Sequence, residues 1–146
     1  MKNIILAAIA AMTLTLTACD KTTIVQYNEL PAAAQQTLST YFADEQIAVI
    51  QKEYDDWGIR YNVIFSNANE IEFNKKGEWQ DIKCRATKVP DGIVPERIMQ
   101  YVVQTYPEAA IWELKRDKRS YEVELSNMVE LKFDLNFNII DLDHED

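Results

Sequence analysis

The sequence predicts an α+β fold made of two tandem repeats, each with one helix packed on a four-stranded antiparallel sheet. Three observations support this prediction. The chain matches itself at a distance of 60 residues, so that residues 38–82 fall on residues 98–142 without a gap. Both halves begin with a proline-marked segment whose apolar residues recur at helical spacing. Both halves continue with short segments in which apolar and polar residues alternate, as they do in half-buried strands.

The first element expected in each half is a helix. One helix should follow Pro31, and the other should include Pro95 in its first turn and stop before Pro107. The apolar positions at helical spacing are Leu30, Ala34, Leu38, Tyr41 and Phe42 in the first half, and Val94, Ile98, Tyr101 and Val102 in the second.

Four strands are expected after each helix. They fall at about residues 48–55, 59–66, 70–73 and 79–83 in the first half, and at about 110–116, 120–126, 129–133 and 138–141 in the second. Asn67-Ala68 and Asn127-Met128 mark tight reversals, where asparagine tolerates a positive φ.

The two halves should touch each other. A unit of about 55 residues has a marginal core, because a small domain buries too little of its surface. Joining both units into one sheet, or packing them side by side, would enlarge that core. The link over residues 85–90 is short, which favours contact over free movement.

Composition excludes several functional classes. The 146 residues include 15 basic and 24 acidic ones, a net charge of −9 that argues against nucleic acid as a partner. With three glycines, no glycine-rich phosphate loop can be written. The single histidine, His144, lies near the end, where a frayed tail is expected. We therefore expect no catalysis, no cofactor and no metal site.

The first residues indicate export from the cytoplasm. Lys2 precedes an apolar run that is too short to span a bilayer. The run ends in Leu16-Thr17-Ala18-Cys19, which resembles the lipobox of bacterial lipoproteins. That resemblance implies a signal peptide over residues 1–18, diacylglycerol on Cys19, and anchoring in a membrane on the periplasmic side of the cell envelope. Residues 19–28 are polar enough to form a lipidated leash.

The repeat and its motifs resemble the PepSY-like family, also called β-lactamase-inhibitor-like after its fold. The motifs are a proline before each helix, a Tyr-x-Val strand (residues 61–63 and 121–123) and a third strand that begins with an acid (residues 70–73 and 130–133). The resemblance covers residues 30–142 and implies an envelope location. It places one α-β4 repeat at residues 29–84 and the other at residues 89–143. With Cys19 lipidated, only Cys84 remains, so the chain cannot form the disulfides of the inhibitor protein itself.

Outward-facing acids and exposed tryptophans are the candidate partner-binding residues. If the helices cover one face of the sheet, the other face stays open to a protein or peptide, or simply to solvent. Trp79 is expected in the core, Cys84 as a buried and inert thiol, and the basic segment 115–119 as a charged hairpin tip. The candidates for partner binding are Trp57, Trp112, Glu70, Glu122, Glu124 and Glu130.

Three functions remain open from the sequence. The first is a non-catalytic, lipid-anchored envelope protein that binds an unknown protein or peptide through its open sheet. The second is an inhibitor of a periplasmic protease or hydrolase, which would use the turn at residues 55–58 as its inserting loop. The third is a carrier of a small molecule or of Ca²⁺, which needs six to eight converging oxygen ligands.

Overall fold

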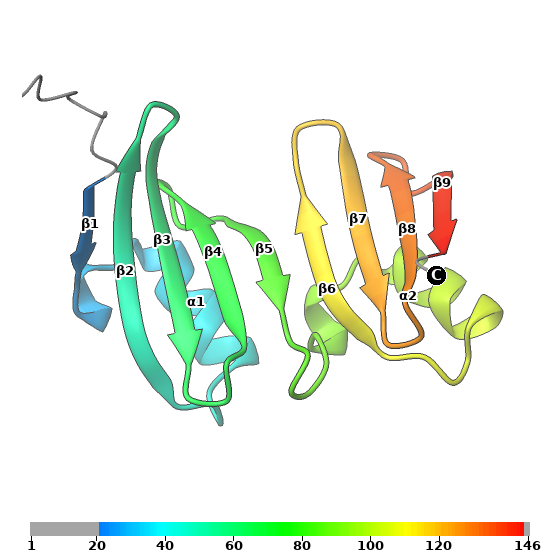
Figure 1. Cartoon of the computed structure of the whole chain (residues 1–146), viewed down its shortest axis with the longest axis horizontal. Helices are drawn as coiled ribbons and strands as arrows, with labels where there is room; N and C mark the ends of the chain where they lie inside the picture. Colours follow the sequence, from blue (N-terminus) through cyan, green and yellow to red (C-terminus); the bar gives the residue numbers. More distant parts are fainter. Residues whose placement is uncertain (1–20, 145–146) are drawn as a thin grey trace, which may run out of the picture.

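The computed structural model describes residues 21–144, and side-chain positions up to residue 142. Two helices lie on one side of a single antiparallel sheet of nine strands, whose spatial order is the order of the sequence (Figure 1). The predicted signal peptide and Cys19 lie outside the described residues. Among the described helices, none is long and apolar enough to cross a membrane.

The first half contains five of the strands. The helix α1 begins directly after Pro31, whose fixed φ suits a helix start. Its buried residues, Ala34 and Leu38, face the sheet. The elements are β1 (Lys21–Ile24), the 3₁₀ turn η1 (Tyr27–Glu29), α1 (Ala32–Tyr41), β2 (Ile47–Asp55), β3 (Gly58–Phe65), β4 (Glu70–Asn74) and β5 (Trp79–Lys83).

The second half repeats this order, except that none of its described strands takes the place of β1. The helix α2 begins directly after Pro95 and buries Ile98 and Val102. The elements are the 3₁₀ turn η2 (Asp91–Ile93), α2 (Glu96–Thr105), β6 (Ile111–Arg116), β7 (Ser120–Leu125), β8 (Val129–Asp134) and β9 (Ile139–His144). The predicted helices and strands are therefore found close to their expected places.

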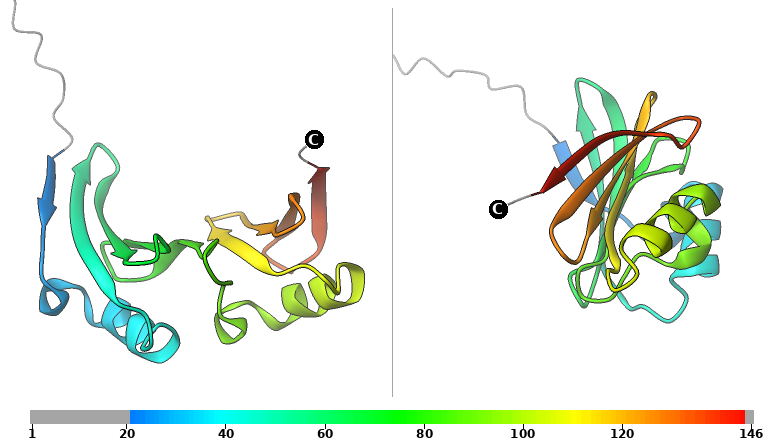
Figure 2. Two further views of the ribbon diagram at one scale, coloured as in Figure 1. Left: turned by 60° about the horizontal axis from the view of Figure 1, so that its bottom comes forward. Right: turned by 90° about the vertical axis from the view of Figure 1, so that its right-hand side faces the viewer.

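The sheet bends away from the helices. Both helices lie under its convex side, and the two ends of the sheet rise on the opposite side (Figure 2). The inward side chains of β2 to β8 form one core with the helices, including Phe65, Phe73 and Phe133, which are at most 2% exposed. The other face of the sheet is therefore concave and has no helix over it.

The four strands expected in each half do not form a separate sheet. Of the two arrangements that the sequence left open, the structure has the halves joined into one sheet. The last strand of the first half, β5, pairs with the first strand of the second half, β6, and sets Ile82 opposite Leu114. Both side chains are completely buried. Joining the halves edge to edge merges two marginal cores into one larger core, which a repeat unit of this size needs for stability.

The expected leash does not extend over residues 21–28. Residues 21–24 form β1, which pairs with β2 from Lys21 opposite Tyr54 to Ile24 opposite Gln51. Residues 27–29 form η1, closed by a capping box between Gln26 and Glu29. β1 is polar because it is an edge strand that is largely exposed, and a short polar segment gives no sequence signal for a strand.

The ungapped alignment at 60 residues is correct only for the second part of each unit. Val63 and Val123 are equivalent, 60 residues apart, but their partners Ile50 and Leu114 are 64 apart. Pro31 and Pro95, which precede the helices, are also 64 apart. The β2–β3 hairpin of the first half is therefore four residues longer than the β6–β7 hairpin. It extends past the last residue pair of β6–β7 by three pairs, which lie between Glu53 and Gly58.

In the two asparagine turns, the positive φ falls on the residue after the asparagine and not on the asparagine itself. Ala68 and Met128 adopt φ of 69° and 65°. Asn67 and Asn127 precede them and accept a hydrogen bond from the backbone N–H two residues further on. The asparagine side chains therefore mimic a backbone turn, and the strained position falls on the next residue.

A buried polar side chain fastens the link between the halves. Asn69 is 1% exposed. Its amide nitrogen donates to Glu45 at 3.0 Å and to Thr87 at 2.9 Å, and its oxygen accepts from the N–H of Ala86 at 3.2 Å. Without Asn69, each of these groups would lose a hydrogen-bond partner. Asn69 therefore holds the link against the first half.

Candidate functional site

Charged side chains are concentrated on the concave face of the sheet. Alternation along each strand places apolar side chains toward the helices and polar ones on this face. At least ten carboxylates share the face with four basic side chains from the strands. The acids include Glu53, Asp55, Glu70, Glu72, Asp81, Glu113, Glu122, Glu124, Glu130 and Asp141, and the bases are Arg60, Lys83, Lys115 and Lys132.

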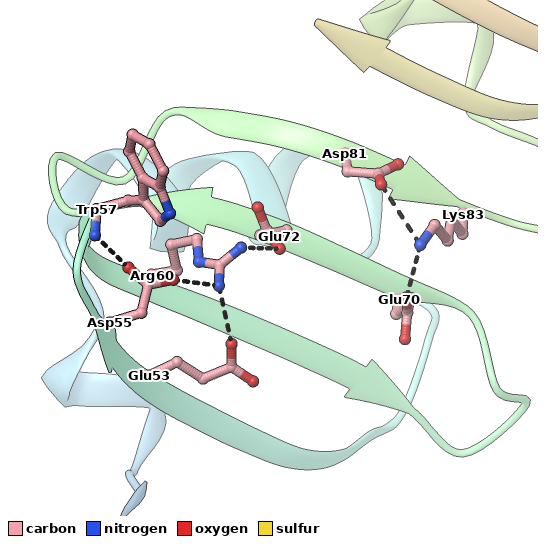
Figure 3. Close-up of polar contacts among 8 residues, drawn as sticks. All are labelled: Glu53, Asp55, Trp57, Arg60, Glu70, Glu72, Asp81 and Lys83. Atoms are coloured by element: carbon pink, nitrogen blue, oxygen red, sulfur yellow. Dashed lines mark hydrogen bonds and ion pairs between the residues drawn. The ribbon is translucent and has the colours of Figure 1, made fainter. Parts of the chain in front are cut away.

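Arg60 organises the end of the face in the first half (Figure 3). Its guanidinium lies 2.5 Å from Asp55, 3.5 Å from Glu72 and 3.7 Å from Glu53. Burial raises the pKa of Glu72, and the charge of Arg60 opposes this rise only in part. One cation thus serves three acids, so the cluster retains a negative field.

Lys83 forms the next cluster toward the centre of the face (Figure 3). Its ammonium lies 3.2 Å from Glu70 and 3.4 Å from Asp81. Burial alone would lower the pKa of Lys83, but the charge of Asp81 and the hydrogen bond to Glu70 outweigh burial and raise it. The lysine therefore stays charged, and it is shared between two carboxylates.

The junction between the two halves holds the most strongly perturbed acid of the face. Burial raises the pKa of Glu113 to about 7, and the neighbouring charge of Asp81 adds to the rise. A side-chain hydrogen bond with Asp81 further favours the protonated form of Glu113.

The second half forms a shallow hollow on the same face. The hollow has a volume of about 220 Å³. Lys132 crosses it to Glu122 at 2.9 Å, and Arg85 from the link reaches Glu124 at 2.6 Å. Acids predominate in its wall, which consists of Glu113, Glu122, Val123, Glu124, Glu130, Leu131, Lys132 and Asp141.

The three tryptophans have three different roles. Trp57 is 95% exposed at the tip of the β2–β3 hairpin, where its backbone N–H donates a hydrogen bond to Oδ1 of Asp55 at 2.8 Å (Figure 3). Trp112 is half-buried at a bulge of β6 and lies 6.0 Å from the guanidinium of Arg85. Trp79 is buried, as predicted, with Arg116 stacked 4.0 Å from its ring.

The structure brings four of the predicted candidates onto one face and leaves two apart. Glu70, Glu122, Glu124 and Glu130 share the concave face. Trp57 stands at the hairpin tip at one end of it, and Trp112 packs against Arg85.

Sequence reasoning missed the two acids at the centre of the face, Asp81 and Glu113. The alternating segments 81–83 and 113–115 contain the signal for both acids, but only the pairing of β5 with β6 places them together.

The face offers charge, and the described residues provide neither a metal cluster nor a reactive thiol. Within the described part of the chain, no three acidic, cysteine or histidine side chains converge to hold a metal ion. Cys84 is completely buried, and burial raises the pKa of its thiol to about 12, so it has almost no thiolate at neutral pH. What the face offers is a broad negative surface that a positively charged molecule can contact.

Comparison with known proteins gives the family and the fold. The family model described as "Putative beta-lactamase-inhibitor-like, PepSY-like" matches residues 15–60 and 59–141. A search of the curated proteins found no match.

Solved structures from Bacteroides species share the fold over most of their length. A periplasmic protein of the DUF2874 family from Bacteroides vulgatus is 42% identical, with a TM-score of 0.83 over 86% of this chain and 98% of that one. A protein from Bacteroides thetaiotaomicron, described as a "putative calcium-regulated periplasmic protein", is 44% identical, with a TM-score of 0.83 over 84% and 97%. A second Bacteroides vulgatus periplasmic protein, of unknown function, is 30% identical, with a TM-score of 0.79 over 84% and 99%. The chain therefore belongs to the PepSY-like, β-lactamase-inhibitor-like family.

Proposed function

We propose that this chain is a non-catalytic periplasmic binding protein whose concave sheet face docks a basic segment of another protein. The observation that carries the proposal is the excess of at least ten carboxylates over four strand cations on one open face. The fold name of the family, which refers to an inhibitor of another protein, supports a protein as the partner.

Electrostatics explains why such a face would select its partner. A concave surface of one sign focuses its field and attracts an oppositely charged segment from a distance. The internal ion pairs around Arg60, Lys83 and Lys132 hold the carboxylates in place before the partner arrives. The acids are therefore preorganised for binding, which lowers the conformational cost of association.

The lipobox supports a tether for this binding protein. We infer that diacylglycerol on Cys19 holds the chain at a membrane on the periplasmic side. The periplasmic descriptions of the three relatives agree with that compartment. The first described strand, β1, starts at Lys21, two residues along the sequence from the lipobox cysteine.

A charge-neutralising variant tests the docking face. Glu72, Glu122 and Glu130 are replaced by glutamine, which keeps the shape of each side chain and removes three charges from the face. The matched control replaces Asp44 by asparagine and Glu96 and Glu108 by glutamine, which removes three exposed charges elsewhere.

Binding of a fluorescent lysine-rich peptide is then measured at several salt concentrations. The proposal predicts at least tenfold weaker binding and a reduced salt dependence for the face variant only. Equal weakening in both variants would show that net charge, and not the face, attracts the peptide, and would contradict the proposal.

Inhibition of a periplasmic hydrolase is the second candidate function. The observation in its favour is the lengthened β2–β3 hairpin, which presents Trp57 at 95% exposure as an inserting tip would. The test is a panel of periplasmic proteases and β-lactamases assayed with the wild-type chain and with Trp57→Ala. Inhibition that the substitution abolishes would support this function, and no inhibition of any enzyme in the panel would remove it.

Calcium is tested alongside, because one relative is described as calcium-regulated. We assign no calcium ligands, since no group of described side chains converges to hold a metal ion. Adding millimolar CaCl₂ to the peptide-binding assay should change affinity no more than the same ionic strength of NaCl does. A calcium-specific change would show that the ion acts on the face.

A further inference from the structure

The strand β9 leaves one long edge of the sheet without a partner. Within residues 21–144, β9 pairs with β8 alone. Its apolar side chains are partly exposed, with Ile139 and Leu142 each 39% exposed and Ile140 56% exposed. An edge strand with apolar side chains and free backbone groups is a place where another strand can pair.

The same chain contains a covered version of this edge. β5 lies 60 residues before β9 and has the same bulge against its inner neighbour. Trp79 and Ile82, the equivalents of Ile139 and Leu142, are only 9% and 0% exposed. The difference lies in β6, which pairs along the outer edge of β5 and sets Leu114 opposite Ile82.

The covered edge also specifies the chemistry of its partner strand. On β6, Lys115 lies opposite Asp81 and Glu113 lies opposite Lys83, on either side of Leu114. In β9 the corresponding residues are Asp141, Leu142 and Asp143, so the acid Asp143 stands in the sequence where Lys83 stands in β5. A strand that matches β9 therefore needs a basic residue at both positions, with an apolar residue between them.

A further basic residue belongs beside this triplet. Next to Lys115, Arg116 donates from Nε to the backbone oxygen of Trp79 at 2.7 Å and closes the end of the edge. Its guanidinium also covers the ring of Trp79. An arginine at the same place on a partner strand would reach the backbone oxygen of Ile139.

We propose that the free edge of β9 docks an extended strand of another protein that alternates basic, apolar and basic residues, and that this strand adds antiparallel to β9 as β6 adds to β5. This is a second interaction surface, separate in mechanism from docking on the concave face, because main-chain pairing supplies the contact and side-chain alternation supplies the specificity.

A second copy of this chain is a poor occupant of the edge. Antiparallel self-pairing about Leu142 sets Asp141 of each chain opposite Asp143 of the other, and pairing about Asp141 sets the two copies of Asp141 opposite each other. Like charges directly opposite each other destabilise a pair of strands. These two registers therefore disfavour a second copy, while the edge remains open to a basic strand.

A peptide built from β6 tests the proposal on the full chain. The probe is the blocked peptide Ala-Ala-Ile-Trp-Lys-Leu-Lys-Arg, which is residues 109–116 with lysine in place of Glu113. One control peptide has proline in place of leucine, which keeps the charge but cannot pair as a strand. Hydrogen exchange of the chain at millimolar peptide, with the affinity from fluorescence anisotropy, gives the readout.

The proposal predicts slowed exchange in residues 139–144 with the leucine peptide and not with the proline peptide. Asp141→Lys should weaken binding roughly threefold or more, and a peptide with glutamate in place of its second lysine should regain that affinity. Asp44→Lys, which makes the same change of charge away from both β9 and the concave face, should leave the affinity of the leucine peptide within twofold.

Four results would overturn the proposal. Equal affinity of the proline peptide, or an equal loss with Asp44→Lys, would show that the peptide binds by charge alone. Absence of protection in β9 at millimolar peptide would show that the edge does not accept a strand. A dimer in sedimentation equilibrium that Asp141→Lys strengthens would show that the edge serves a second copy.

Discussion

Asp81 and Glu113 meet on neighbouring strands at the junction of the two halves, and the Asp81 carboxylate helps to hold the pKa of Glu113 at about 7. The two acids come from different repeats, so their contact exists only because β5 and β6 join the halves into one sheet. The relationship makes the junction sensitive to pH in a range where an isolated glutamate would already be fully ionised.

Replacing Glu113 should remove part of the pH dependence of stability. Because its pKa is raised on folding, the protonated form favours the folded state. The contribution is complete below the unfolded pKa near 4.5 and is lost as the pH rises through about 7. At pH 8 we therefore expect Glu113→Gln to be more stable than wild type by about 1 to 2 kcal/mol, allowing for solvent screening.

Urea unfolding between pH 4.5 and 8 checks this prediction. The control is Glu122→Gln, which removes a charge from the same face without touching Asp81. Its curve should stay parallel to that of wild type. A constant offset for Glu113→Gln across the whole pH range would contradict the assignment.

The tip of the lengthened hairpin should matter little for stability. Trp57 is almost fully exposed, so Trp57→Ala should change the free energy of unfolding by less than about 0.5 kcal/mol. Trp79→Ala is the contrast, because it empties a core position and strips Arg116 of its stacking partner, at a cost of about 3 to 5 kcal/mol. Thermal unfolding of both variants measures the difference, and a large loss with Trp57→Ala would show that its ring packs on the protein.

The link between the halves should depend on Asn69. Asn69→Val installs the residue that the second half has at Val129, but it leaves Glu45, Thr87 and the N–H of Ala86 without this partner. We expect a loss of about 2 kcal/mol in urea unfolding. Asn127→Ala removes a single long turn hydrogen bond and should cost less than about 1 kcal/mol. Equal costs for the two would mean that Asn69 acts only as a turn residue.

The buried thiol should be chemically silent in the folded protein. In a Cys19→Ser chain, Cys84 is the single cysteine, and both its burial and its pKa of about 12 oppose reaction. Labelling by a disulfide reagent at pH 8 should be at least ~100-fold slower than in urea, because it requires opening of the core. Labelling at comparable rates in both conditions would place the thiol in contact with solvent.

The sequence predicted the elements better than their assembly, for physical reasons. Alternation and helical spacing report which side of a segment is buried, so the helices and the eight longer strands were predictable. They do not report which edges pair, so the contact between Ile82 and Leu114 was left open. The identical pair Glu53 and Glu113 fitted the 60-residue alignment by coincidence, since the lengthened hairpin shifts the true equivalence by four residues.

The candidate site shows the same division. Glu70, Glu122, Glu124 and Glu130 were predicted from strand alternation, and the structure places them on the concave face. Asp81 and Glu113 were not predicted, because their position depends on the junction. The exposure of Trp57 also depends on hairpin length, which a turn motif alone does not determine.

Site-specific photo-crosslinking in the host cell tests the central claim, that the concave face is where a protein partner docks. A photoreactive phenylalanine analogue replaces Asn62 on the concave face in one strain and the exposed Gln36 on α1 in another. The account predicts a discrete adduct from position 62 that the three glutamine substitutions on the face abolish, and none from position 36. Adducts from position 36 alone, or adducts from position 62 that survive neutralisation of the face, would contradict it.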